Sequence, residues 1–274
     1  GKLGYVLTQQ KYKSIGFIFS ANAYNNNSYY GLTKYDGKQQ TIYANIIYQS
    51  IIGTTVHKFR TGISFVNDIY TENYNTANFK RRETVPGTFF EYTYSPVTKF
   101  TAVAGVRFDY HNEYKWIVTP RLHLKYDFDP KTNLRFSAGS GFRTANIFTE
   151  NAGLFASARV YNILNPSSAY GYGLDPERSW NYGFNFVRNF KLNYRSGSFS
   201  IDAYHTSFSN QVVVDIDADP QKILFYNLNG KSFSNSVQVE LNYELLPKFD
   251  IRLAYRWLDV QTNYSNTVLF LRLL

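Results

Sequence analysis

The chain has 274 residues, of which 44% are hydrophobic, 19% aromatic and 18% charged, and its formal net charge is +9. It is too apolar and too aromatic to be intrinsically disordered. No run of about 18 apolar residues occurs, which excludes a helical membrane span. The absence of cysteine excludes disulfides, a thiol nucleophile and Cys-ligated metal centres.

Apolar and polar residues alternate with a period of two through nearly every ordered-looking segment, which predicts β-strands and an all-β fold. In the clearest case, Trp116, Val118 and Leu122 fall on one face, whereas Arg121 and His123 fall on the other. About a dozen strands are expected. In chain order, the alternating segments are 15–24, 41–48, 59–70, 90–94, 100–110, 116–128, 134–138, 180–192, 199–208, 233–245 and 249–257.

The length of the alternating rows favours a membrane barrel over a soluble β-sandwich or propeller. Strands of soluble proteins most often have about 5–6 residues, whereas a tilted membrane-spanning strand needs about 9–11. Several rows reach or exceed that length, and some begin or end in aromatic residues, such as Trp116 and Phe128 or Phe249 and Trp257. Aromatic rings at both ends of an apolar row are typical of the interfacial girdles of outer-membrane barrels. The sequence therefore predicts an antiparallel transmembrane β-barrel.

The connections fall into two alternating sets. Short turns are expected at 50–56, 95–98, 129–132, 193–196 and 246–248, and longer loops at 25–37, 73–87, 139–177 and 215–230. Outer-membrane barrels have short periplasmic turns and longer extracellular loops, so we expect the long set to lie outside the cell. The polar rows then face the barrel interior as a charged lining. Its residues include Arg107, Asp109, Arg121, His123, Lys125, Asp127 and Arg135.

One segment carries a family resemblance. A strand ending in Gly139-Ser140-Gly141-Phe142-Arg143 is followed by Asn146-Ile147-Phe148, a long loop, and Leu174-Asp175-Pro176-Glu177-Arg178-Ser179-Trp180-Asn181-Tyr182-Gly183. This arrangement resembles the TonB-dependent receptors, the plugged outer-membrane transporters of Gram-negative bacteria. The composition is most similar to receptors of the Bacteroidota.

The resemblance implies a 22-stranded barrel filled by an N-terminal plug, in a chain more than twice as long as this one. No plug or TonB-contacting segment is visible, and the ending at 267–274 differs from the aromatic-terminated closing strand of such barrels. We therefore expect residues 1–274 to be the C-terminal part of the barrel, with about twelve strands present. A complete 12-stranded barrel is the alternative. If the plug exists, the charged lining is the wall against which it docks; otherwise it is a solvated pore lining.

The resemblance also implies a function, namely the binding of a scarce, bulky nutrient at the extracellular loops and its import with TonB-coupled energy. The nutrient would be a ferric siderophore, another metal chelate or a corrinoid, and the basic loop residues would attract an anionic chelate or the phosphates of lipopolysaccharide. Loop residues rich in Tyr, Asn and Arg supply binding surface. The candidate ligand-binding residues are Tyr29, Tyr30, Tyr35, Arg81, Arg82, Arg143, Asn146, Arg159, Tyr161, Tyr170 and Tyr172.

Catalysis finds little support, because the four histidines are scattered and no HExxH or G-x-S-x-G motif occurs. We expect no catalytic residue, metal site or cofactor, and no nucleic-acid binding. A passive porin, or a lipid-hydrolysing barrel using His205, stays open as an alternative. The partners expected are outer-membrane lipid and lipopolysaccharide, the TonB system through a region outside this sequence, and a surface lipoprotein.

Overall fold

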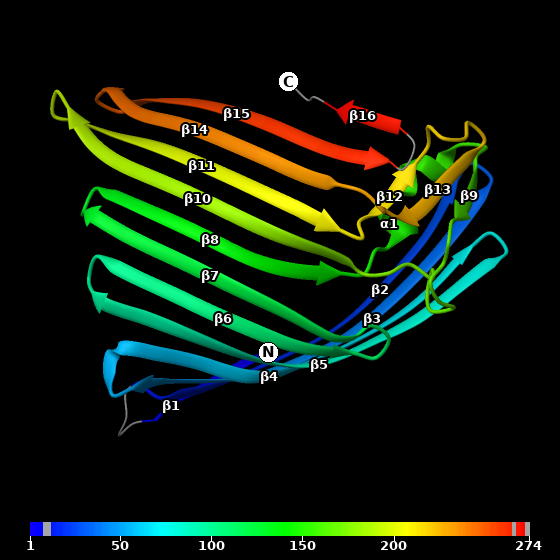
Figure 1. Cartoon of the computed structure of the whole chain (residues 1–274), viewed down its shortest axis with the longest axis horizontal. Coiled ribbons are helices and arrows are strands. Elements are labelled where there is room, and N and C mark those ends of the chain that lie inside the picture. Colours follow the sequence, from blue (N-terminus) through cyan, green and yellow to red (C-terminus); the bar gives the residue numbers. More distant parts are fainter. Residues whose placement is uncertain (8–11, 265–266, 272–274) are drawn as a thin grey trace.

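In the computed structural model, which describes residues 1–7, 12–264 and 267–271, one antiparallel sheet of thirteen strands curves into an open trough (Figure 1). Strands that are neighbours along the chain are neighbours in the sheet, apart from three short strands that belong to connections. The thirteen are β1 (Lys2–Val6), β2 (Ser14–Tyr30), β3 (Thr33–Ile52), β4 (Thr54–Tyr74), β5 (Ala77–Val97), β6 (Phe100–His111), β7 (Lys115–Asp129), β8 (Thr132–Arg143), β10 (Glu177–Leu192), β11 (Arg195–Ser209), β14 (Ser232–Leu246), β15 (Phe249–Tyr264) and β16 (Thr267–Leu271).

The meander confirms the predicted all-β, antiparallel barrel architecture. β4 and β5 each have 21 residues and pair from His57↔Tyr94 to Tyr74↔Ala77. Such strands exceed the roughly 9–11 residues that a membrane-spanning strand needs. Within the described ranges, β1 and β16 form the two edges of the sheet, so these residues do not show the closed 12-stranded barrel considered as an alternative. The described helices include none that is long and apolar enough to cross a membrane.

The two faces of the sheet carry different side chains, as the alternation predicts. On β6, Phe108 and Tyr110 are exposed on the convex face, whereas Asp109 between them is only 2% exposed on the concave face. On β7, Trp116 is exposed and its neighbour Ile117 is buried. The rings of Tyr110 and Trp116 meet edge to face at 5.3 Å, as expected of an interfacial girdle.

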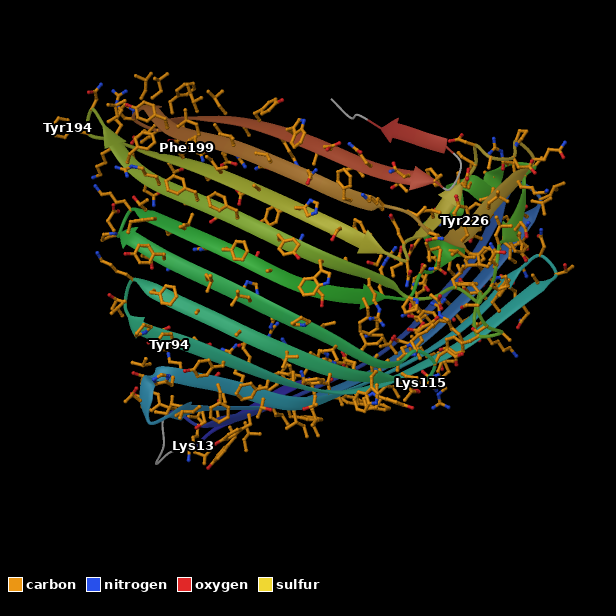
Figure 2. The ribbon with its side chains drawn as sticks, viewed as in Figure 1. Lys13, Tyr94, Lys115, Tyr194, Phe199 and Tyr226 are labelled. Carbon is orange, nitrogen blue, oxygen red and sulfur yellow. The ribbon has the colours of Figure 1, made fainter. Side chains whose placement is uncertain are left out.

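The five short turns lie together at one end of the trough, the end that carries Lys13, Tyr94 and Tyr194 (Figure 2). Each is tight; for example, only Pro130 and Lys131 separate β7 from β8. The prediction of short turns is therefore confirmed.

Two predicted long loops are wrong. Residues 25–37 and 73–87 continue the strands as tall hairpins, which turn at Gly31-Leu32 between β2 and β3 and at Asn75-Thr76 between β4 and β5. The apolar row stops toward the tips of these hairpins because the convex face there meets water rather than lipid. The backbone nevertheless stays in the ladder, since pairing satisfies its N–H and C=O groups.

The other two long connections fold together at the hairpin end of the trough (Figure 1). Residues 144–176 contain α1 (Ile147–Glu150), the short 3₁₀-helix η1 (Ala152–Ala156) and β9 (Val160–Ile163). Residues 210–231 contain β12 (Val212–Asp215) and β13 (Lys222–Asn227). β13 pairs antiparallel with β12 and parallel with β9, which makes a second sheet of three strands. We call residues 144–176 and 210–231 together the cap.

The cap and the tall hairpins share an aromatic core. Phe148 of α1 is the central side chain, 1% exposed, and its ring stacks on Tyr74 of β4 with centroids 5.1 Å apart. The cap residues Tyr161 and Phe155 pack edge to face on Tyr74 at 5.1 and 4.9 Å. The largest apolar cluster among the described residues therefore joins the cap to the concave face of β3–β5.

Candidate functional site

Beneath the cap, the concave faces of β3, β4 and β5 present buried charges and phenols. Strand alternation places Tyr35, Glu72, Arg81 and Glu83 on this face, and all four are buried. The register aligns Tyr35 with Tyr74 and Tyr70 with Arg81 on neighbouring strands. We call the four buried residues Tyr35, Glu72, Arg81 and Glu83 the wall cluster.

Arg81 is the main link between the wall cluster and the cap. Its Nη1 donates a hydrogen bond to the Ala145 carbonyl at 3.2 Å, and its Nη2 donates to the side-chain oxygen of Asn146. Its Nε lies 2.9 Å from the Glu83 carboxylate, and its guanidinium lies 4.0 Å from the ring centroid of Tyr70. A buried arginine with charge, hydrogen-bond and ring partners is well compensated.

Glu72 holds the cap through phenols. The Tyr35 hydroxyl donates to one Glu72 oxygen at 2.7 Å, and the hydroxyl of the cap residue Tyr172 donates to the other. The Tyr35 oxygen also lies 3.0 Å from the Thr149 hydroxyl of α1. Burial, and then the Glu72 charge, raise the pKa of Tyr172 far above its ordinary range, so this phenol stays protonated and able to donate.

Glu83 makes a third link. The Thr144 hydroxyl donates to it at 2.8 Å, and Nε2 of His111 lies 3.9 Å from the same carboxylate oxygen. His111 Nδ1 accepts hydrogen bonds from the backbone N–H groups of Glu113 and Tyr114 at 3.1 and 3.3 Å. In the neutral ring the proton therefore sits on Nε2, which faces Glu83.

The ionisation of Glu83 predicts that acid loosens the cap. Glu83 lies on the cap side of the Tyr110–Trp116 pair, outside the membrane-spanning part. Burial raises its pKa, but His111, Arg81 and Thr144 together outweigh burial and lower it below the ordinary value of 4.5. A depressed pKa in the folded state contributes stability above the unfolded-state pKa, and that stability is lost as pH falls through the folded-state pKa.

We therefore expect proteolysis of the cap in the wild type to speed up as pH falls below about 4.5, measured with an acid-active protease. In Glu83→Gln this acid-dependent increase should be smaller, because residue 83 no longer titrates. Glu113→Gln is the control, since Glu113 has no side-chain hydrogen bond or ion pair among the described residues. Identical pH profiles for wild type and Glu83→Gln would contradict the assignment.

The structure brings together five predicted ligand-binding residues, Tyr35, Arg81, Asn146, Tyr161 and Tyr172, at the cap–wall contact. Tyr30 packs against the same core. Other predicted residues tie the cap to itself or to strand ends. Arg143 forms a two-pronged ion pair with Glu150 at 3.0 and 3.2 Å and contacts Glu177, while Arg159 donates to the Ile216 carbonyl at 2.7 Å.

The side chains of the other three predicted ligand-binding residues, Tyr170, Tyr29 and Arg82, lie outside the aromatic core and the wall cluster. Tyr170 donates to the backbone carbonyl of Arg82 at 2.7 Å from the cap. Tyr29 is 69% exposed and Arg82 is also exposed, and both point from the convex face, away from the wall cluster. The side chains of Arg81 and Arg82 thus sit on opposite faces of β5, and of the two only the Arg81 side chain contacts the cap. The role of all these residues in ligand binding stays a prediction.

Glu72 and Glu83 are absent from the predicted site residues. The alternation of inward and outward side chains along 68–74 and 79–85 would place Glu72 and Glu83 on the concave face, but only once both segments are assigned to strands.

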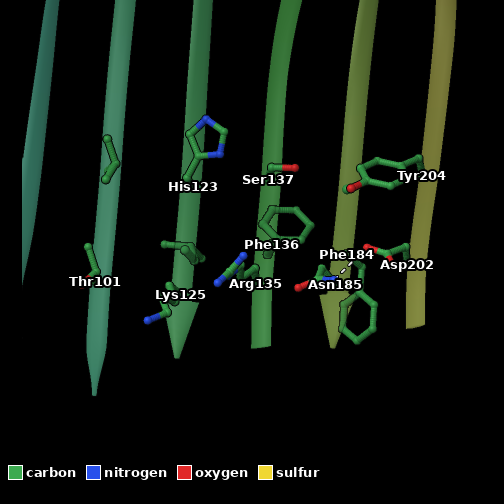
Figure 3. Close-up of a pocket in the computed structure, with 13 residues that line it drawn as sticks. Thr101, His123, Lys125, Arg135, Phe136, Ser137, Phe184, Asn185, Asp202 and Tyr204 are labelled. Atoms are coloured by element: carbon green, nitrogen blue, oxygen red, sulfur yellow. Dashed lines mark hydrogen bonds between the residues drawn. The ribbon is translucent and has the colours of Figure 1, made fainter. Parts of the chain in front are cut away.

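Lower on the concave face lies a polar hollow of about 370 Å³ between β6 and β11 (Figure 3). Polar side chains from five strands line it, and Asn185 donates a hydrogen bond to Asp202 at 2.7 Å. Nearby, Arg107 bonds Asp109 at 2.7 Å and Ser64 at 2.6 Å. All seven predicted lumen-facing residues, namely Arg107, Asp109, Arg121, His123, Lys125, Asp127 and Arg135, share this face by register.

Outside the concave face, His205 lies on the convex side of β11. Its Nδ1 is 2.7 Å from the Asn235 side-chain oxygen, and its ring stacks on Tyr182. No serine hydroxyl forms a hydrogen bond with His205 within the described part of the chain. The pairing that a serine hydrolase needs is therefore not formed here.

The family model described as TonB dependent receptor-like, beta-barrel matches residues 2–270. The chain belongs to this family. The match confirms the resemblance given by residues 139–183 and places the wall in the bacterial outer membrane. The family consists of receptors and transporters rather than enzymes, so the hydrolase alternative is not supported.

Solved structures agree with the family. The alcaligin outer-membrane receptor of Bordetella pertussis aligns with 97% of this chain at 15% identity, with a TM-score of 0.60. The ferripyoverdine receptor of Pseudomonas aeruginosa aligns with 95% at 11% identity and 0.61, and the hemophore receptor of Serratia marcescens with 95% at 13% identity and 0.57. No curated protein matches the sequence. The TonB-dependent receptor barrel described here spans 47%, 40% and 54% of those three chains, respectively.

Proposed function

We propose that the chain is the C-terminal part of the barrel wall of a receptor that captures a scarce, bulky nutrient outside the cell and imports it with TonB-coupled energy. The observation that carries the proposal is the family match over residues 2–270. The nutrient class is a ferric siderophore, another metal chelate or a corrinoid. Three structural neighbours are described as receptors for alcaligin, for ferripyoverdine and for a hemophore crystallised with heme.

The two levels of the concave face suit two steps of such a cycle. The hollow near His123, Lys125 and Arg135 is a charged wall against which a plug domain would dock. The cap above it, held by the wall cluster, would meet the nutrient first. The aromatic core and the polar contacts of the wall cluster both join the cap to the wall, so ligand contact with the cap has a path to the lumen.

The partners belong to the same proposal. They are the TonB system, acting through a region outside this sequence, a surface lipoprotein at the cap, and outer-membrane lipid and lipopolysaccharide around the convex face.

Uptake in living cells tests the proposal. A strain lacking the gene is complemented with the intact protein that contains this chain, and uptake of labelled ferric siderophores, heme and cyanocobalamin is measured with and without TonB and the proton gradient. We expect uptake of one probe to be restored only when both are present. TonB-independent entry of small solutes, together with steady conductance in planar bilayers, would instead establish a passive porin.

A further inference from the structure

The convex face carries an apolar groove of about 510 Å³ that the nutrient pathway does not use. Its floor runs over Pro86 and Thr88 of β5, and bulky side chains stand on either side. The walls are formed by Phe17, Ile46, Ile63 and Phe65 on β2–β4 and by Phe108, Tyr110 and Trp116 on β6 and β7. Small residues between two large-residue ridges leave a slot on the face that meets lipid.

A fixed arginine lies at the cap end of this groove. Arg82 Nε donates to the Asn67 side-chain oxygen at 3.0 Å, and the Thr84 hydroxyl donates to the same oxygen at 3.1 Å. Asn67 is only 6% exposed, whereas Arg82 is exposed. Within the described ranges, the terminal guanidinium nitrogens of Arg82 make no hydrogen bond or ion pair. Such an oriented fork suits the two oxygens of a phosphate.

More positive charge surrounds Arg82. The register puts Lys38 and Lys80 on either side of Thr71, on the same convex face and one step farther toward the hairpin tips. Both lysines are exposed, and neither pairs with an acid in the described part of the chain. The rim above the groove is thus basic, while the groove below it is apolar.

The basic rim, Arg82 and the apolar groove follow one another along β5 in the same order as the phosphorylated head group and the hydrocarbon chain of a lipid. Along β5, Arg82, Thr84, Pro86 and Thr88 follow each other on the convex face, and four strand residues span about 13–14 Å. A phosphorylated head group at Arg82 would therefore leave its hydrocarbon chain over Pro86 and Thr88. In the outer membrane, the leaflet at the cap end is the outer one.

We propose that this groove and its arginine form a binding site for the phosphorylated, acylated glycolipid of the outer leaflet. The orientation rests on the proposed function, whereas the site itself rests on the groove, the Thr84–Asn67–Arg82 arrangement and the basic rim. The phosphate binds Arg82 with support from Lys38 and Lys80, and one acyl chain fills the slot.

Native mass spectrometry of the intact detergent-solubilised protein that contains this chain tests the site. The probes are bisphosphorylated lipid A, the same lipid after phosphatase treatment, and phosphatidylglycerol. For the wild type we expect lipid A to bind at least tenfold more tightly than either other lipid. Arg82→Gln should weaken lipid A binding about tenfold, because it removes a charge-assisted phosphate contact.

The matched control is Lys34→Gln. Lys34 is a basic residue of the same face, but it is already paired with Asp36 at 2.8 Å; its replacement should leave lipid A binding unchanged. Thr88→Phe fills the groove and should weaken lipid A binding even with Arg82 present, and the unfolding temperature of this variant shows whether the barrel is intact. Equal binding of phosphatidylglycerol and lipid A, or equal effects of Arg82→Gln and Lys34→Gln, would overturn the site.

Nutrient uptake by the wild type is measured in parallel, so that the two proposals fail separately. TonB-dependent uptake without lipid selectivity removes only the lipid site. Lipid selectivity without TonB-dependent uptake removes only the receptor function.

Discussion

Replacement of Arg81 by methionine is expected to release the cap and to lower the free energy of unfolding by about 3–5 kcal/mol, the range for breaking a buried charge pair by removing one partner. Arg81 is 7% exposed and contacts Glu83, Ala145 and Asn146. Without it, Glu83 keeps a buried charge and the Ala145 carbonyl loses a donor. Urea unfolding of the detergent-solubilised protein measures the change, and trypsin cleavage after Arg159 reports release of the cap.

Arg82→Met is the matched control, because it removes the same side chain from the next position on β5 but from the convex face. Its effect on unfolding should stay within about 1 kcal/mol, as for other exposed charges. Equal destabilisation by the two substitutions, or an unchanged rate of cleavage after Arg159 in Arg81→Met, would show that Arg81 does not hold the cap.

Phe148→Ala should have an effect of similar size, about 3–5 kcal/mol, because removal of a buried phenylalanine loses transfer free energy and leaves a cavity. The Phe148 ring contacts those of Tyr74, Phe79 and Tyr172, with centroids 5.1, 5.3 and 5.6 Å away. Tyr29→Ala, an aromatic truncation at an exposed position, should cost little. The same urea titration measures both variants.

The double variant with Arg81→Met and Phe148→Ala separates local from cooperative loss. If either substitution alone frees the cap, the second removes contacts that are already lost, and the combined effect falls well below the sum. A strictly additive result would mean that the polar and aromatic contacts hold different parts of the cap.

The membrane-spanning wall could be predicted from the sequence because lipid and water impose opposite demands on successive residues. Trp116 to Phe128 shows this alternation, and β7 has the faces that it predicts. Above the membrane, the convex face of a strand meets water instead of lipid, so the apolar row that marks the strands disappears. The sequence of 25–37 and 73–87 therefore predicts loops, although strand pairing satisfies the backbone N–H and C=O groups of these segments.

The wall cluster was harder to predict. Arg81 looks like an exposed anion-binding residue when 73–87 is taken as a loop, and only its place on β5 turns it inward. Its cap partners Ala145 and Asn146 are distant in sequence, and no local pattern specifies that contact. By contrast, the inward direction of His123 and Arg135 follows from strand parity alone.

The parallel pairing of β9 with β13 has a consequence for how the cap can change. Val160 aligns with Lys222 and Ile163 with Phe225, although β10 and β11 separate the two segments along the chain. A one-residue shift of β9 alone would slide every one of these pairs and turn Tyr161 and Ile163 out of the aromatic core. A change of register in one of these two surface connections therefore has to be matched in the other, even though the two are far apart in sequence.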